Sequence, residues 1–174
     1  LTYSILIRVL VGVNPLTFYR RMLPVMAFGF STSSSGATLP VTLETVEKRL
    51  GVDKGVGSFV IPLGATINMD GTAIMQGVAT VFIAQAYNVD IGMAGYLMVI
   101  LTATMASIGT AGVPGVGLIT LALVLTQVGL PVEGIALIIG VDRLLDMSRT
   151  VVNVVGDATV ASVVARSEDG FDDA

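Results

Sequence analysis

Residues 64–72 read Gly-Ala-Thr-Ile-Asn-Met-Asp-Gly-Thr, a polar stretch inside a long apolar run. Across residues 55–141 the only charged side chains are Asp70, Asp90 and Glu133, where a soluble domain of that length would carry roughly twenty. We therefore expect Asp70 to lie at membrane depth, where a carboxylate costs about 2.5 to 3.5 kcal/mol and is normally kept to bind an ion or pair with another group. The neighbouring Gly, Thr and Asn residues interrupt helices and free backbone carbonyls, which a bilayer tolerates only where they line a cavity or coordinate a ligand. The stretch predicts a broken helix that holds a cation.

The composition of the chain favours a membrane protein. Of the 174 residues 53% are hydrophobic and 13% charged, and the mean hydropathy is +0.87, values that point away from a soluble globular domain. The absence of Cys excludes disulfides and thiolate metal sites, and the absence of His leaves any proton relay to carboxylates. No segment resembles a cleavable signal peptide. Because Leu1 opens inside a helical pattern without an initiator Met, we expect the C-terminal part of a longer polypeptide.

Two segments consist of an apolar arm, a polar or glycine-rich tip and a second apolar arm. The first spans 14–54 with its tip at 31–38, and the second spans 91–131 with its tip at 107–117. Each arm is shorter than the roughly 20 residues that a bilayer crossing needs, so both segments predict re-entrant hairpins. For the first segment, the alternative is a Ser-rich loop in water.

The whole chain then predicts an all-α membrane protein with two re-entrant hairpins and broken transmembrane helices in an inverted repeat. Interrupted segments in corresponding positions of two repeats indicate the binding site of a secondary transporter. The predicted segments are the end of a transmembrane helix at 1–13, hairpin 1 at 14–54, a broken helix at 55–90, hairpin 2 at 91–131, a last transmembrane helix at 132–166 whose apolar pattern runs over 135–165, and an acidic cytoplasmic tail at 167–174.

The distribution of Lys and Arg predicts the orientation of these segments. The loops at 88–92 and 129–134 contain no Lys or Arg. The positive-inside rule therefore places the first hairpin on the cytoplasmic side and the second on the outer side, so that the two tips meet near the midplane. The same rule predicts that the C-terminus is cytoplasmic. The expected location of the protein is the plasma membrane or the bacterial inner membrane. The basic residues that flank the first hairpin or follow the last helix are Arg20, Arg21, Lys48, Arg49, Lys54 and Arg166.

The last helix carries one polar stripe on an otherwise apolar surface. Its members fall within an arc of about 100° at helical spacing, and leaving the four charged ones in lipid would cost roughly 10 to 14 kcal/mol. The stripe must therefore face protein, water or a ligand. In one alternative, Asp146 and Arg149 at i, i+3 pair with each other and only hold helices together. The stripe consists of Asp142, Asp146, Arg149, Thr150, Asn153 and Asp157.

The chemistry of the stripe matches an acidic amino acid and its co-ions. The planar guanidinium of Arg149 suits a carboxylate, Asp146 can accept an ammonium group, and the N–H groups of the tip at 33–36 can hold a second carboxylate. Asp157 and Asp70, with the carbonyls of the unwound stretch, offer the hard oxygen ligands that Na⁺ accepts.

The chain resembles the dicarboxylate/amino acid:cation symporter family, which includes the excitatory amino acid transporters. Four motifs spread over nearly the whole chain carry the resemblance: Ser-Ser-Ser-Gly-Ala-Thr-Leu-Pro at 33–40, Gly-Ala-Thr-Ile-Asn-Met-Asp-Gly-Thr-Ala at 64–73, Ala-Ser-Ile-Gly-Thr-Ala-Gly-Val-Pro-Gly at 106–115, and Leu-Asp-Met-Ser-Arg-Thr-Val-Val-Asn-Val-Val-Gly-Asp at 145–157. In that family they form hairpin 1, the broken seventh helix, hairpin 2 and the eighth helix of a transport domain that moves as an elevator. Hairpin 2 is its extracellular gate.

The resemblance also implies roles for individual residues. Asp146 would bind the amino group and Arg149 the side-chain carboxylate of the substrate. The implied substrate-binding residues are Ser33, Ser34, Ser35, Thr72, Gly112, Val113, Gly117, Asp146, Arg149, Thr150 and Asn153. The implied sodium ligands are Gly64, Asn68, Asn153 and Asp157 in one site, Thr66, Ser107, Ile108 and Thr110 near Met69 in a second, and Asn68 and Asp70 in a third that is completed by an earlier helix outside this chain.

The sequence departs from the family pattern at two places. Members often carry an additional Arg at the start of the serine run or just after the amino-binding Asp, where this chain has Ser33 and Met147. Arg143, one turn before Met147, is a candidate to replace it. Gly36 stands where relatives often have another Ser. These departures leave the substrate ranking and the ion coupling open.

The sequence thus predicts a symporter that couples sodium influx to uptake of aspartate or glutamate. Members that carry C4-dicarboxylates tend to lack the acid at Asp146, and members that carry neutral amino acids tend to lack the arginine at Arg149. A proton-coupled glutamate/aspartate or C4-dicarboxylate symporter is the mechanistic alternative, and a channel or a non-transporting membrane scaffold is the alternative from another class. The expected partners are an acidic amino acid, the lipid bilayer and, from the resemblance, two further copies in a homotrimer. No nucleic acid and no enzymatic activity are expected, because no nucleophile, base and orienting group occur together.

Overall fold

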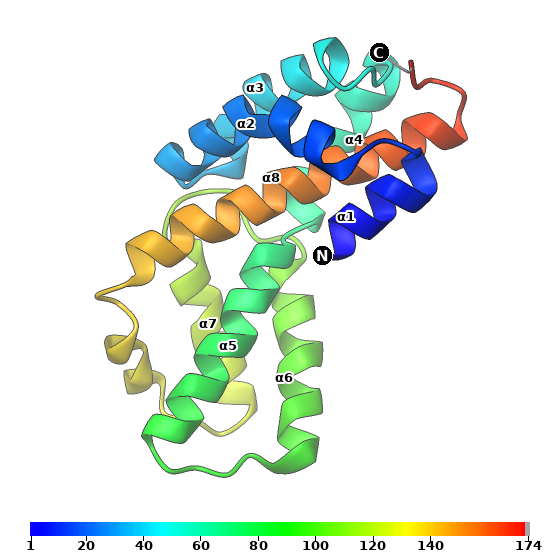
Figure 1. Cartoon of the computed structure of the whole chain (residues 1–174). Coiled ribbons are helices and arrows are strands. Elements are labelled where there is room, and N and C mark those ends of the chain that lie inside the picture. Colours follow the sequence, from blue (N-terminus) through cyan, green and yellow to red (C-terminus); the bar gives the residue numbers. More distant parts are fainter. Residues whose placement is uncertain (173–174) are drawn as a thin grey trace.

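Helix α8 (Asp142–Ser167) runs diagonally through the molecule, and the other helices pack on it from two sides (Figure 1). The computed structural model describes residues 1–172, so the last two residues of the predicted acidic tail lie outside the described residues. The predicted all-α class is confirmed for the described part, whose β pairing is limited to one isolated bridge between Val52 and Phe171. Preceding α8 are α1 (Thr2–Leu6), the π-helix η1 (Ile7–Val11), α2 (Pro15–Thr32), α3 (Ser35–Lys48), α4 (Lys54–Ile67), α5 (Asp70–Ala86), α6 (Gly92–Ser107), α7 (Val116–Gln127) and the 3-10 helix η2 (Val132–Leu137).

The first helical segment ends where the sequence predicts a turn. Gly12 follows η1 with a φ of 83°, a left-handed conformation that glycine adopts without strain. Asn14 then caps α2, because its Oδ1 accepts the backbone N–H of Leu16 at 2.9 Å. Pro15 occupies the first helical position, where a backbone N–H would have no partner within the helix, so its absence costs no hydrogen bond.

Both segments that predict a hairpin form a helix–loop–helix pair. In the first pair only Ser33 and Ser34 separate α2 from α3. Ser33 has a φ of 53°, which ends α2, and the Oγ of Ser34 accepts the N–H of Ala37 at 3.0 Å, which starts α3. In the second pair, α6 and α7 are joined by residues 108–115, among which Gly109 and Gly115 have positive φ. The two pairs therefore have tips of very different length.

The predicted interruption of the central helix lies at Asn68 and Met69. Their backbone angles, φ −107° and ψ 68° at Asn68 and φ −101° and ψ 50° at Met69, are not helical, so α4 stops before them and α5 starts after them. The two halves have different neighbours. Helix α4 packs against α3 and α8, whereas α5 packs against α6, α7 and α8. The break therefore separates α4, which packs with α3 on α8, from α5, which packs with α6 and α7 below α8 in Figure 1.

The expectation of one continuous last helix over 135–165 is wrong at its start. The structure has the short 3-10 helix η2, then a turn, and α8 begins only at Asp142. The N–H groups of Ile138 and Val141 bond three residues back, to Ile135 and Ile138, which is the tighter 3-10 spacing. Gly140 lies in this turn, and glycine disfavours a helix interior by about 1 kcal/mol relative to alanine.

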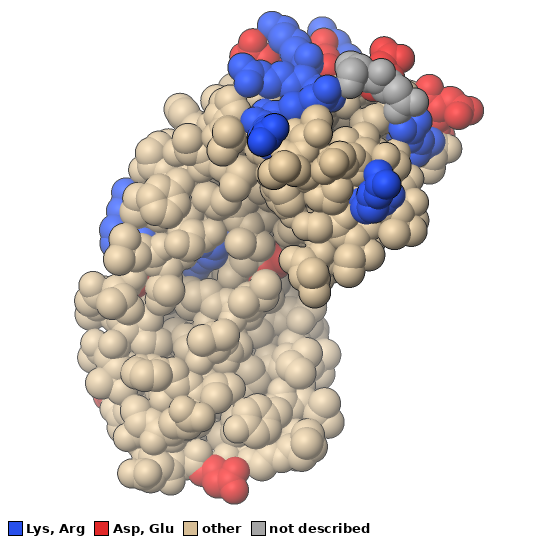
Figure 2. All heavy atoms as spheres, in the orientation of Figure 1, with Lys and Arg blue, Asp and Glu red and all other residues tan. Residues whose placement is uncertain are grey.

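Two larger apolar clusters, and a small one between α6 and α7, stabilise the described part of the molecule. One of the larger clusters joins η1, α2 and α4 to the C-terminal half of α8 and contains Phe18, Met22 and Ile61; the other joins α5, α7 and η2 and contains Ile83 and Leu121. Charged side chains gather mainly at one end of the molecule, while the opposite half shows few of them (Figure 2). Among residues 1–172, no helix combines the length with the unbroken apolar character that a membrane crossing requires.

Candidate functional site

The polar stripe of α8 is buried beneath the helices that pack against α8. None of its six side chains is more than 9% exposed, although four of them are charged. The stripe thus faces protein, as the cost of leaving these groups in an apolar medium requires. Its exposed fractions are 9% for Asp142, 3% for Asp146, 5% for Arg149, 3% for Thr150, 3% for Asn153 and 2% for Asp157.

The tips of the two helix pairs touch each other above this stripe. The carbonyl of Gly112 in the second tip accepts the Oγ–H of Ser34 at 2.6 Å and the backbone N–H of Gly36 at 3.1 Å. A Cβ atom at Gly112 would lie 3.0 Å from the Gly36 nitrogen and 3.2 Å from the Cβ of Ser35. The absence of a side chain at Gly112 therefore lets two tips from distant parts of the sequence approach each other.

Asp146 and Arg149 form a buried ion pair that is also bound to the second tip. The Nε and Nη2 groups of Arg149 donate to Oδ1 of Asp146 at 2.8 and 2.5 Å. Oδ2 of Asp146 accepts the N–H of Gly115 at 2.8 Å. The pairing that the sequence offers as an alternative to ligand binding is thus present, and it accounts for both oxygens of the acid.

This pairing leaves other buried polar atoms without a partner. Nη1 of Arg149 and Oγ of Ser33 are both buried and have no hydrogen-bond partner among the residues that the structure describes. A buried donor without a partner costs roughly 1 to 3 kcal/mol, more if it is charged. Both atoms belong to residues that the sequence assigns to the substrate, and a ligand carboxylate could accept from each of them.

Close packing around Arg149 depends on two glycines. A Cβ at Gly117, on α7, would overlap the Nη1 atom of Arg149, and a Cβ at Gly71, on α5, would overlap its backbone carbonyl oxygen. Glycine at position 71 therefore lets α5 approach the backbone of α8 closely, and glycine at position 117 leaves room for the guanidinium of Arg149 beside α7.

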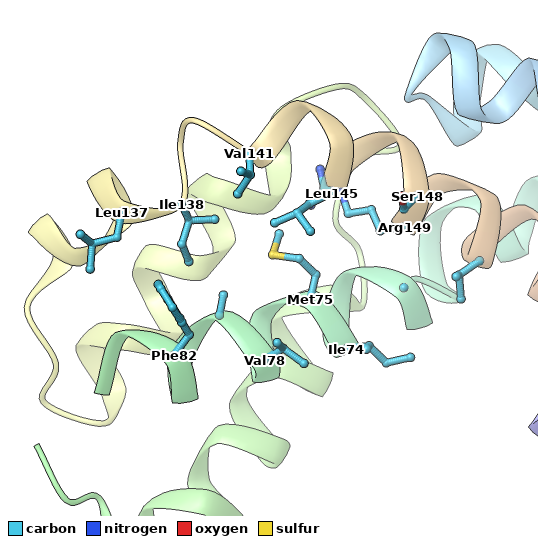
Figure 3. A pocket seen from close by; sticks show the side chains of 13 residues that line it. Ile74, Met75, Val78, Phe82, Leu137, Ile138, Val141, Leu145, Ser148 and Arg149 are labelled. Carbon is cyan, nitrogen blue, oxygen red and sulfur yellow. The ribbon is translucent and has the colours of Figure 1, made fainter. Parts of the chain in front are cut away.

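A cavity near the stripe is apolar and only partly coincides with the predicted substrate site. It has a volume of about 560 Å³ and lies between α5, η2 and the start of α8 (Figure 3). Arg149 is its only charged lining residue and the only predicted substrate residue among them. Figure 3 shows Ile74, Met75, Val78 and Phe82 on one side and Leu137, Ile138, Val141 and Leu145 on the other.

Asp157 and Asn68 meet at the break in the central helix. Nδ2 of Asn68 donates to Oδ1 of Asp157 at 2.9 Å, and the Asp157 side chain is buried. A Cβ at Gly64 would lie 2.5 Å from the same Oδ1, so a glycine is needed there. The carbonyl of Gly64 accepts the N–H of Asn68 at 2.8 Å. Three of the predicted ligands of the first sodium site are therefore adjacent.

Asn153 connects the break in the central helix to the polar stripe of α8. Its Oδ1 accepts the N–H of Gly71 at 2.8 Å, and its Nδ2 lies 3.2 Å from the sulfur of Met69 and 3.4 Å from Oγ1 of Thr72. Thr150, one turn earlier, donates its hydroxyl to the carbonyl of Asp146 at 2.9 Å. A shift of the chain at Met69 would therefore be transmitted to α8 through one amide side chain.

The predicted residues of the second sodium site lie where the second tip meets the end of α4. The N–H of Gly109 donates to the carbonyl of Thr66 at 2.8 Å, which joins the two segments. The hydroxyls of Ser107 and Thr110 are buried and bond to carbonyls within their own segment, those of Thr104 and Ala106. The structure does not bring every predicted residue inward, since Thr66, Ile108 and Val113 have exposed side chains.

Asp70 is exposed at the start of α5, whereas Asp157 is buried on α8. Its Oδ2 accepts the hydroxyl proton of Tyr3 at 2.5 Å. Among the described residues no three acidic side chains form a metal-binding group. Asp157 instead accepts a hydrogen bond from the Asn68 amide, and Asp70 accepts one from the Tyr3 hydroxyl.

Sequence reasoning did not single out three residues that the structure places at these sites. Tyr3 bonds Asp70, Gly115 bonds Asp146, and Gly71 lies against Arg149. A glycine next to Asp70 within an apolar helix was a signal of close backbone approach for Gly71. Gly115 and Tyr3 carry no such signal, because their partners are 31 and 67 residues away in the sequence.

Comparison with known proteins places the chain among transporters. A model of the "Sodium:dicarboxylate symporter family" matches residues 1–167. The chain is 52% identical over 151 residues to an excitatory amino acid transporter of Caenorhabditis elegans, 49% over 151 residues to excitatory amino acid transporter 1 of Rattus norvegicus and 47% over 152 residues to excitatory amino acid transporter 5 of Homo sapiens. Each alignment covers 87% of this chain and 30%, 28% and 27% of the respective relative, so the chain spans less than a third of their length. With the family model matching nearly its whole length and half of the aligned residues identical, the chain belongs to the sodium:dicarboxylate symporter family.

Proposed function

We propose that this chain forms the substrate- and cation-binding part of a secondary active symporter that couples sodium influx to uptake of aspartate or glutamate. The observation that carries the proposal is the buried pair of Asp146 and Arg149, which is bound to the N–H of Gly115 in the second tip. A buried carboxylate and a buried guanidinium, held between the tips of the two helix pairs, can receive a ligand that carries both an ammonium group and a carboxylate.

Substrate binding would exchange partners within this pair. The ammonium group of the amino acid takes the place of the Arg149 guanidinium at Asp146, and the guanidinium turns to the side-chain carboxylate, for which Nη1 already has no competing partner. The α-carboxylate then lies at the first tip, near the N–H groups and the Oγ of Ser33. A C4-dicarboxylate has no ammonium group and would leave Asp146 uncompensated, which is costly in a buried site.

The break in the central helix supports the coupling to sodium. It places Asp157 and Asn68 together on one side and connects Met69 to Asn153 on the other, so ion ligands and substrate ligands share the same two segments. Cations held by Asp157, by Asp70 and by the carbonyls near Thr66 would order the backbone at 68–69 and thereby the substrate residues on α8. Proton coupling remains the alternative, with the same two carboxylates as acceptors.

We further infer that the two helix pairs are re-entrant hairpins of a multi-pass protein of the cell membrane. The exposed apolar residues of α6, among them Met93, Leu97 and Ile100, support contact with lipid or with apolar parts of the full-length protein. Family resemblance supports an elevator movement of this part within a homotrimer, with the second hairpin as the extracellular gate. The C-terminus would then be cytoplasmic.

The test is uptake of labelled aspartate by vesicles that contain the full-length protein. An inward sodium gradient should drive concentrative uptake, and a pH gradient alone should not. Glutamate should compete with the label, whereas succinate should compete poorly. Arg149→Ala should abolish uptake, while Lys48→Ala, which removes a surface charge paired with Glu44, should leave it intact. Uptake driven by the pH gradient alone would identify the proton, not sodium, as the coupling ion. Unchanged uptake in Arg149→Ala would contradict the substrate assignment and favour the channel or scaffold alternative.

A further inference from the structure

Tyr3 ties the first helix of the chain to the acid at the start of α5. Its hydroxyl donates to Oδ2 of Asp70 at 2.5 Å, across 67 residues of sequence. A hydrogen bond from a phenol to a carboxylate is of the charge-assisted kind, which is shorter and about twice as strong as one between neutral groups. The orientation of the Asp70 carboxylate is thus set by α1, an element outside every cation site that the sequence predicts.

The same hydroxyl also reaches the cation ligands on α8 and at the helix break. A Cβ at Gly156 would lie 2.6 Å from the Tyr3 oxygen and 2.8 Å from Nδ2 of Asn68, so both groups converge on the bare surface of α8 at that glycine. Asn68 in turn bonds Asp157. Tyr3 therefore occupies the point where the surroundings of Asp70 and of Asp157 come together.

Asp70 is open to ions on one side of this contact. A cavity of about 520 Å³ is lined by Tyr3, Tyr19, Met26 and Asp70, with valines of α8 as its floor. The Tyr3 hydroxyl bonds Oδ2, and within residues 1–172 no side chain donates a hydrogen bond to Oδ1. Because a tyrosine hydroxyl has lone pairs as well as a proton, the Tyr3 oxygen can accept a cation while it donates to the acid.

We propose that Tyr3 is a positioning residue for cation binding at Asp70: its hydroxyl holds Oδ2 and directs Oδ1, together with its own lone pair, toward the ion. The inference rests on the proposed function, since it names a residue that sets the sodium affinity of that symporter. Tyr19 is the matched comparison. It lines the same cavity, but its hydroxyl is 3.0 Å from the hydroxyl of Ser4, a neutral group.

The experiment is calorimetric titration of aspartate into the full-length protein at a series of sodium concentrations, for the wild type, Tyr3→Phe and Tyr19→Phe. Tyr3→Phe should shift the sodium dependence of the aspartate Kd to about tenfold higher sodium, the size expected for loss of a hydrogen bond to a charged group. The Kd at saturating sodium should stay within about twofold of the wild type, because Tyr3 touches none of the proposed substrate residues. Tyr19→Phe should reproduce the wild-type curve. Gly156→Ala, which crowds the Tyr3 hydroxyl and Asn68 together, should shift the curve in the same direction as Tyr3→Phe.

The possible outcomes distinguish the role of Tyr3 from the proposed sodium-coupled symport. A sodium dependence of Tyr3→Phe that equals the wild type, or that moves to lower sodium, overturns the role of Tyr3 while the symporter proposal stands. Equal shifts in Tyr3→Phe and Tyr19→Phe also overturn it, because they would reflect the cavity rather than Asp70. Aspartate binding by the wild type that does not depend on sodium overturns the proposed coupling itself.

Discussion

Gly117 lies directly against the guanidinium of Arg149, so closely that a Cβ at position 117 would overlap Nη1. The overlap involves the nitrogen that has no hydrogen-bond partner within the described structure. Helix α7 therefore confines the Nη1 group, to which the proposed binding mode assigns the side-chain carboxylate of the substrate. The second tip contacts both members of the pair, since it also holds Asp146 through Gly115.

Gly117→Ala should accordingly displace the Arg149 guanidinium and weaken aspartate binding. The expected loss is tenfold or more in Kd, because overpacking costs about 1 to 3 kcal/mol and a misplaced guanidinium loses its charge-assisted bonds. Isothermal titration at saturating sodium measures the effect. Gly77→Ala, on the neighbouring α5, is the control, because a Cβ there meets nothing within 4 Å. Equal Kd values for the two variants would contradict the placement of Arg149 in the site.

Gly64→Ala should act on sodium rather than on substrate. A Cβ at Gly64 would lie 2.5 Å from Oδ1 of Asp157, so the acid must move away from Asn68. We expect the sodium concentration for half-maximal binding to rise about tenfold, the loss expected when about 1.4 kcal/mol of ion binding is removed. Gly57→Ala on the same helix is the comparison, because its Cβ would make an ordinary contact of 3.5 Å with Val46. A normal sodium curve in Gly64→Ala would exclude Asp157 as a ligand.

Asp146→Asn should change how well succinate competes with aspartate for the proposed substrate site. The substitution keeps the shape of the side chain but removes the charge that would hold the ammonium group, and it releases Arg149 from its ion pair. Breaking a buried pair by changing one partner costs about 3 to 5 kcal/mol. We expect aspartate binding to weaken at least a hundredfold and the ratio of succinate to aspartate competition to rise. If the ratio stays at the wild-type value, Asp146 does not bind the amino group.

Ser34→Ala should loosen the contact between the tips. The hydroxyl both donates to the Gly112 carbonyl and caps α3 at Ala37, and loss of such a cap costs about 1 kcal/mol. Hydrogen exchange should become faster in residues 108–117. Ser58→Ala, whose hydroxyl bonds the Gly55 carbonyl at the surface, should leave exchange there unchanged. Unaltered protection of the second tip in Ser34→Ala would show that other contacts hold it.

Phe171→Ala should destabilise the end of the molecule opposite the second tip without affecting binding. The Arg166 guanidinium lies 4.7 Å from the centre of the Phe171 ring, and the adjacent backbone bonds the loop after α3: Asp53 N–H donates to Gly170, and Asp172 N–H donates to Gly51. A cation–π contact at an exposed site contributes about 0.5 to 1 kcal/mol. Protease cleavage within residues 49–54 should accelerate while the aspartate Kd stays constant. A change in Kd would mean that this end is coupled to the ligand site.

The parts of the fold that depend on local chemistry could be predicted from the sequence, and those that depend on distant contacts could not. Asn14-Pro15, the serine tip and the break at Asn68 involve residues that end or start helices by their own backbone preferences. The start of α8 was misplaced because residues 132–141 are mostly apolar, and an apolar run does not distinguish an α-helix from a 3-10 helix followed by a turn.

The candidate site likewise has features that the sequence predicts and features that depend on distant contacts. Helical spacing was sufficient to place Asp146, Arg149 and Asn153 on one buried stripe, because the period of a helix fixes which side chains share a face. Spacing could not show that Asp146 would bind Gly115 or that Asp70 would bind Tyr3, since these contacts depend on how helices pack. The sequence-based roles of the sodium and substrate residues remain predictions that the variants above test.

The unequal tips have a mechanical consequence. Two residues, one of them held at a φ of 53°, turn α2 into α3, and they leave no slack for the arms to separate. Eight residues join α6 to α7, and Gly109 and Gly115 among them can straighten or recoil at little conformational cost. Conformational freedom is thus concentrated in the connection between α6 and α7, on one side of the Asp146–Arg149 pair. The long connection therefore has the conformational freedom to move, whereas the two-residue connection holds its serines in a fixed position.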